Sequence, residues 1–106
     1  MPKYLFEASY TAEGAKGLLK EGGSKRRKAV ENTLKALGGK IDGFYYAMGE
    51  HDVYLIVDVP DNVSAAALSM AVNAAGAVRL KTTVLLTPEE IDMAAKKTVD
   101  YRAPGK

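Results

Sequence analysis

The one histidine of the chain, His51, stands between two carboxylates, Glu50 and Asp52. These residue types can hold a metal ion or exchange protons with a substrate. Successive residues of a strand point to opposite sides, so Glu50 and Asp52 would face one way and His51 the other. The chain offers no second histidine and no cysteine to complete a ligand set. We therefore expect no metal here and a role in the turn for these three residues, with Asp52 capping the hairpin backbone. His51 remains a candidate proton-transfer group.

A second chemical signal is a basic run at residues 25–28, which follows the glycine pair at 22–23 and Ser24. Free N–H groups at a helix N-terminus, together with cationic side chains, can hold a carboxylate or a phosphate. The segment lacks the Gly-Lys-Ser or Gly-Lys-Thr ending of a phosphate loop. Two interpretations stay open, a solvated basic first turn and an anion site. In the anion site, Ser24, Arg26 and Arg27 would bind the ligand.

Aromatic residues crowd the strands of the predicted sheet, and an apolar cavity with a few polar groups is the usual design of a small-molecule site. The residues that would line such a cavity are Phe44, Tyr46, Met48, Tyr54 and Ile56, with Arg79 or Lys81. Of these, Tyr46, Tyr54, Arg79 and Lys81 are predicted to bind the ligand, and Tyr46 is the second candidate for proton transfer. The alternative is an interface between two copies of the chain, with charges paired across neighbouring strands, such as Glu7 with Lys81.

Hydrophobic periodicity and glycine or proline breaks define the elements that would position these residues. The strands are expected at residues 4–10, 40–48, 52–59 and 78–86. The helices are expected at residues 12–19, 24–37 and about 62–75, with a last helix opening at residues 87–90. Ser24 is the expected N-cap of the second helix, and Thr87 and Glu90 form a capping box in the last one. The second and third strands are close enough in sequence to form a hairpin.

The order strand, helix, strand, strand, helix, strand, with an extra C-terminal helix, is the split βαβ arrangement of ferredoxin-like α+β domains. Residues 1–97 are expected to form one domain. Residues 98–106 show no periodicity, and we expect them to form a tail that hangs loose or reaches over a neighbour.

The two faces of the predicted sheet differ in composition. The face toward the helices would carry Tyr4, Phe6, Ala8, Val53, Leu55, Val57, Val78, Leu80, Val84 and Leu86. The opposite face would carry Leu5, Glu7, Ser9, Phe44, Tyr46, Met48, Tyr54, Ile56, Asp58, Arg79, Lys81, Thr83 and Leu85. This second set is too apolar and aromatic for a surface exposed to water. We therefore predict a homodimer or a larger homo-oligomer in which a second copy covers it.

Composition excludes several classes of partner. The 106 residues match a single domain, and a net charge of +2 is too small to imply nucleic acid or a membrane surface. No apolar run approaches the ~20 residues of a membrane helix, and the N-terminus has no signal-peptide pattern, so a cytoplasmic location is expected. No cofactor is predicted.

Four segments together resemble the GYD domain family of bacterial proteins, over about residues 4–91. They are residues 17–27, 49–52, 60–65 and 82–90. The Gly, Tyr, Asp signature of that family stands here as Gly49, then His51 in place of the tyrosine, then Asp52. The resemblance implies a ferredoxin-like, dimeric α+β barrel and leaves the activity open.

The function predicted on these grounds is an oligomeric small-molecule-binding or sensor-like domain, whose ligand is a small organic or anionic molecule. One alternative is a small cofactor-independent enzyme, oxygenase-like or isomerase-like, with Tyr46 or His51 as its proton-transfer group. This alternative rests on analogy of fold. The other is a structural or assembly subunit without a ligand.

Overall fold

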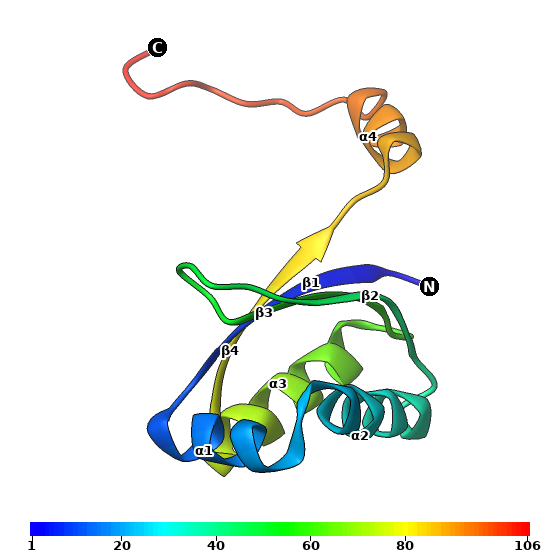
Figure 1. Cartoon of the computed structure of the whole chain (residues 1–106). Helices are drawn as coiled ribbons and strands as arrows, with labels where there is room; N and C mark the ends of the chain where they lie inside the picture. Colours follow the sequence, from blue (N-terminus) through cyan, green and yellow to red (C-terminus); the bar gives the residue numbers. More distant parts are fainter.

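Three helices lie on one face of a four-stranded antiparallel sheet in the computed structural model, which describes residues 1–106 (Figure 1). The strands are β1 (Lys3–Tyr10), β2 (Lys40–Tyr46), β3 (Val53–Asp58) and β4 (Val78–Leu85). The helices are α1 (Ala12–Glu21), α2 (Gly23–Ala36), α3 (Asn62–Ala75) and α4 (Pro88–Ala95). The strand order β2-β3-β1-β4 confirms the ferredoxin-like α+β fold. No helix is both long enough and apolar enough to cross a membrane.

The core lies between the sheet and helices α2 and α3. Alternate residues of β1 and β3 point into it, as the period-two pattern predicts. The buried residues are Tyr4, Phe6 and Ala8 of β1, Val53, Leu55 and Val57 of β3, Val59, Leu34 of α2, and Ala65 and Leu68 of α3. The prediction fails for Val84 and Leu86, which are exposed. The C-terminal end of the edge strand β4 runs beyond the helices there (Figure 1).

A β-bulge in β2 corrects the predicted faces of the sheet. Ile41 pairs with Val57 and Gly43 with Ile56, so Asp42 is an extra residue on β2. One extra residue moves every later side chain to the other face. Phe44 and Tyr46, predicted on the side away from the helices, therefore lie on the helix side, where Phe44 packs against the core.

The start of α4 follows the predicted chemistry, whereas the start of α2 does not. The Asp61 side chain caps α3, and α4 begins with the predicted capping box of Thr87 and Glu90. Helix α2 begins at Gly23 rather than Ser24. Its N-cap is Gly22, whose positive φ of 87° suits glycine and would strain a residue with a side chain. Ser24 is thus a first-turn residue and not the cap.

We expect the Asp61 cap to make stability depend on acid pH. Its Oδ1 accepts a hydrogen bond from the backbone N–H of Ser64 at 2.8 Å, and this bond holds the pKa of the carboxyl below its usual 3.8. Stabilisation by a group with a depressed folded pKa is complete above the unfolded pKa and is lost as pH falls through the folded pKa. Asp61→Asn keeps an acceptor but does not titrate, so its melting temperature should fall less than that of the wild type between about pH 4 and pH 2. The matched control is Asp100→Asn, in the C-terminal tail, and a wild-type slope in Asp61→Asn would contradict the prediction.

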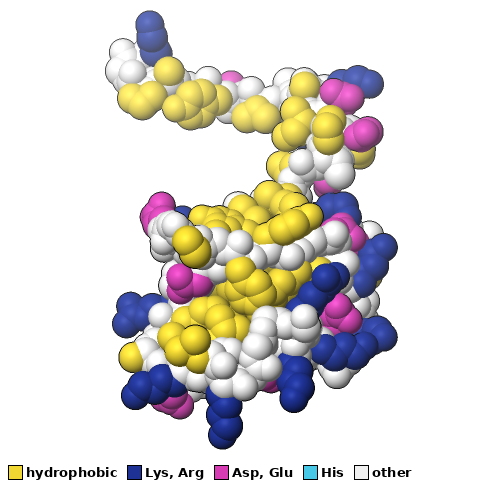
Figure 2. Space-filling model, viewed as in Figure 1, with side chains coloured by type: hydrophobic (Ala, Val, Ile, Leu, Met, Phe, Trp, Pro, Cys, Tyr) yellow, Lys and Arg dark blue, Asp and Glu magenta, His cyan; other side chains and the backbone are white.

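The last part of the chain stands apart from the sheet and the three helices. Beyond β4, residues Leu86 and Thr87 lead into α4, and residues 96–106 continue without helix or strand. We call residues 88–106 the arm. Figure 2 shows open space between the end of the arm and the rest of the molecule, and every residue of α4 is exposed.

Candidate functional site

A cavity of about 90 Å³ lies between the sheet and helices α2 and α3. Its walls come from every strand and from both helices. Its lining residues are Phe6, Ala8, Tyr10, Arg26, Val30, Thr33, Phe44, Val53, Leu55, Leu68, Val72, Val78 and Leu80. Eleven of these 13 residues are hydrophobic, and the exceptions are Arg26 and Thr33. The chain therefore leaves an apolar space at its centre with a single charged group on the wall.

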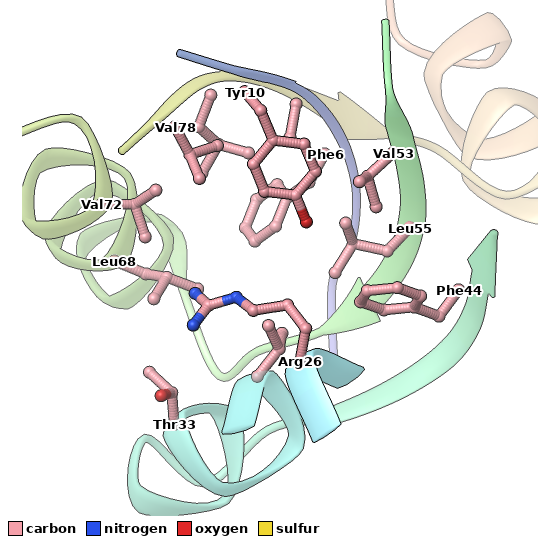
Figure 3. A pocket seen from close by; sticks show the side chains of 13 residues that line it. Phe6, Tyr10, Arg26, Thr33, Phe44, Val53, Leu55, Leu68, Val72 and Val78 are labelled. Carbon is pink, nitrogen blue, oxygen red and sulfur yellow. The ribbon is translucent and has the colours of Figure 1, made fainter. Parts of the chain in front are cut away.

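Arg26 directs its guanidinium across this space, toward Leu68 (Figure 3). It is a first-turn residue of α2, and its neighbours on that helix have different surroundings. Arg27 and Lys28 both approach the carboxylate of Glu31, with N···O distances of 3.1 Å and 3.8 Å. Arg26 is half-buried and makes no ion pair within the chain. A partly desolvated cation without a partner gains more from an anion than one that is already paired.

Two phenols, Tyr10 and Tyr46, lie beside Arg26. The Tyr46 hydroxyl donates a hydrogen bond to the carbonyl oxygen of Gly23, at 3.0 Å. The Tyr10 hydroxyl points into the cavity (Figure 3). Burial, together with the neighbouring Tyr46, raises the pKa of Tyr10 to about 12 although the Arg26 charge opposes that shift. Burial also raises the pKa of Tyr46. Both phenols are therefore neutral near pH 7, where they can donate hydrogen bonds but cannot act as bases.

Tyr10 also marks where the cavity meets neighbouring hollows. It lines two further hollows, of about 240 Å³ against α1 and about 450 Å³ between α1 and the end of β2. The backbone N–H of Tyr10 donates to Oδ2 of Asp52 at 2.8 Å. Asp52, expected to cap its own hairpin, thus holds the end of β1 in place. Sequence reasoning left Tyr10 out of the site, although the alternation of Tyr4, Phe6 and Ala8 extends to it.

The predicted ligand-binding residues do not form one site. Tyr46 lies on the helix side of the sheet, whereas Tyr54, Arg79 and Lys81 belong to the opposite side. The predicted cavity that combines them is therefore wrong, and the bulge in β2 is the reason. The three residues of the predicted anion site do not lie together either. Ser24 is exposed, Arg27 is paired with Glu31, and only Arg26 reaches the cavity.

His51 lies on the side of the sheet away from the cavity. Its Nδ1 is 3.2 Å from Oγ of Ser9, its Nε2 is 3.4 Å from Oε2 of Glu7, and its ring makes a T-shaped contact with the ring of Tyr54. Glu7 is opposite Lys81 in the register, but its carboxylate contacts His51 instead, which corrects the expected ion pair. In a catalytic triad, a histidine and a carboxylate activate a serine as the nucleophile, and the same three kinds of side chain are in contact here. None of the hollows described above includes these three side chains.

Comparison with known proteins gives one result. The family model described as the GYD domain matches residues 4–95 of the chain. No curated protein and no solved structure matches.

Proposed function

Because the chain belongs to the GYD domain family, and membership in this family indicates a fold but not an activity, we propose on the basis of the cavity that the chain binds a short organic anion. The observation that carries the proposal is the unpaired Arg26 on the wall of an otherwise apolar space. The anionic group of the ligand pairs with the guanidinium, and its apolar part enters the cavity. The hydroxyl of Tyr10 supplies a hydrogen-bond donor beside them.

The size of the space limits the ligand. A cavity of 150 Å³ lined by aliphatic and aromatic side chains holds one benzene molecule. The cavity here is about 90 Å³, so its apolar occupant is smaller than a benzene ring. A chain of a few carbon atoms ending in a carboxylate fits this space and its charge.

The state of the phenols favours binding over proton transfer. An enzyme that uses a tyrosine as a base near pH 7 needs a lowered pKa, whereas the pKa values of Tyr10 and Tyr46 are both raised. The proton of the Tyr46 hydroxyl is moreover held by the carbonyl of Gly23. Tyrosine hydroxyls that remain neutral can donate hydrogen bonds to a bound anion, which suits a site that binds the anion without catalysing a reaction.

Thermal unfolding with straight-chain carboxylates tests this proposal. We expect butyrate to raise the melting temperature more than acetate does, because of its apolar tail, and more than butanol does, because of its charge. Arg26→Met keeps the apolar stem and removes the charge. A hydrogen bond to a charged group contributes about 1.5–3 kcal/mol, so the affinity for butyrate should fall by about 10- to 150-fold in this variant.

The matched control is Arg27→Met, which removes the neighbouring charge that is already paired with Glu31. It should keep the wild-type response to butyrate. Equal responses in Arg26→Met and Arg27→Met would overturn the proposal. An equal effect of butanol and butyrate on the wild type would do the same.

A further inference from the structure

One aromatic ring, that of Tyr10, stands between the cavity and the space outside it. The cavity of about 90 Å³ and the two neighbouring hollows, of about 240 Å³ and about 450 Å³, all have Tyr10 among their lining residues. No other residue lines all three. Tyr10 is half-buried, so its side chain borders both the core and the solvent. The ring is therefore a wall that the cavity shares with both hollows.

Tyr10 is held in this position by its backbone and by its ring. Its N–H donates a hydrogen bond to Oδ2 of Asp52 at 2.8 Å, and it pairs with Val78 of β4 in the register of the sheet. On the side of α1, a Cβ at Gly14 would lie 3.1 Å from Cδ1 of the tyrosine, so the ring rests against this glycine. The hydroxyl points into the cavity (Figure 3). The wall is thus fixed at the end of β1 and against α1.

The other large side chains around the cavity do not border open space. Phe6, Leu55 and Leu68 line it from the side of the core, and each is at most 8% exposed. Close-packed residues lie behind such side chains, so truncating one of them leaves only a hole inside the core. Behind the ring of Tyr10 lies the hollow of about 450 Å³, where six of the seven lining residues are hydrophobic. Tyr10 is therefore the position at which the cavity can be enlarged into existing apolar space.

The volume of the ring decides which ligands fit. An apolar cavity of about 150 Å³ holds one benzene molecule, and the cavity here is smaller, at about 90 Å³. Removing the side chain of Tyr10 beyond Cβ would add the space of a phenol ring to the cavity. A ligand that carries a benzene ring could then place it where the tyrosine ring was.

We propose that Tyr10 determines the size of the ligand, because its ring limits the apolar part to a few carbon atoms and excludes aromatic acids. This inference rests on the proposed function, since it concerns the ligand of the same cavity. Hydrophobic pockets discriminate between ligands by size in this way, through the space that they leave for each added group. The ring sets the limit, whereas the hydroxyl donates a hydrogen bond to the anion.

Isothermal titration calorimetry with butyrate and with phenylacetate tests this role. The wild type should bind butyrate more tightly than phenylacetate. In Tyr10→Ala, the ratio of the two affinities should change by about 10-fold or more in favour of phenylacetate, because the overpacking that the aromatic ligand causes is relieved. A ratio measured within one variant does not depend on the fraction of the protein that is folded. Tyr10→Leu, which removes less volume, should change the ratio in the same direction by a smaller factor.

Two further variants separate the ring from other effects. Tyr10→Phe keeps the ring and removes the hydroxyl, so it should weaken the binding of both acids and leave their ratio as in the wild type. Tyr45→Ala is the matched control for the loss of a tyrosine ring. Tyr45 is 72% exposed and lines none of the three spaces, so this variant should keep both affinities.

The possible outcomes distinguish this inference from the proposed function. A wild-type ratio in both Tyr10→Ala and Tyr10→Leu would overturn the size limit alone, if Arg26→Met still weakens butyrate binding. A wild type that binds phenylacetate as tightly as butyrate would overturn the size limit too. If the ratio changes as expected but Arg26→Met binds butyrate as tightly as the wild type, the size limit stands and the anion site does not. Absence of binding of either acid to the wild type and to Tyr10→Ala would overturn both.

Discussion

Replacing Gly14 by alanine should destabilise the protein by about 3 kcal/mol, at the upper end of the range for overpacking. A Cβ at this position of α1 would lie 1.9 Å from the carbonyl oxygen of Ala77 and 3.1 Å from Cδ1 of Tyr10. The carbonyl belongs to the backbone and cannot rotate away as the end of a flexible side chain would. It also accepts a hydrogen bond from the N–H of Thr11 at 3.1 Å, so moving it disturbs the start of α1 as well.

Urea unfolding at one fixed protein concentration measures this loss, with Gly17→Ala as the control. Gly17 lies on the same helix, and a Cβ there would meet nothing within 4 Å. This change should therefore stabilise the protein by about 0.5–1 kcal/mol, because alanine loses less backbone freedom than glycine in a helix. Equal effects of the two substitutions would refute the close packing of α1 against the backbone at Ala77.

The Gly14 contact also reaches the proposed ligand site. The ring of Tyr10 that a Cβ would displace is the one that lines the cavity and the two hollows beside it. Gly14→Ala should thus weaken butyrate binding in whatever fraction of the protein remains folded, whereas Gly17→Ala should not. Packing of α1 and the shape of the cavity are in this way coupled through one aromatic ring.

Truncation of Leu34 to alanine should cost about 2–5 kcal/mol. The side chain of Leu34 has no exposed surface and is the one fully buried residue that α2 contributes to the core. Its removal leaves a cavity between α2 and the sheet, which the surrounding strands can fill only in part. Because α2 also carries Arg26, a loosened α2 should weaken butyrate binding as well.

Leu19→Ala is the matched control for Leu34→Ala. Leu19 is also a helical leucine, but 87% of its surface is exposed. Its truncation should change the free energy of unfolding by no more than about 0.5 kcal/mol. A loss in Leu34→Ala as small as this would show that α2 is not anchored in the core as the structure has it.

Most of the elements could be predicted from the sequence because their signals are local. Alternation of apolar residues marks β1 and β3, the alanine-rich stretch between Asp61 and Gly76 marks α3, and the capping box marks α4. The order of these elements then leaves few ways to build the sheet. The fold class and the buried face of β1 and β3 follow from these local patterns.

The site could be predicted only in fragments. The sequence patterns predict Arg26 and Tyr46 as ligand residues, but with partners that lie elsewhere. Successive helical residues point about 100° apart, so the packing of α2 against the sheet alone decides that Arg26 enters the cavity while Arg27 meets Glu31. No residue type or spacing in the run 25–28 contains that information.

The sequence by itself determined the strands, the helices and their order, since each depends on residues close to one another along the chain. Only the tertiary structure decided which side chains share the cavity. The extra residue Asp42 in β2 pairs with nothing on β3, and this bulge turns Phe44 and Tyr46 toward the helices. A bulge depends on how two strands align, and that alignment is settled by packing against the rest of the molecule.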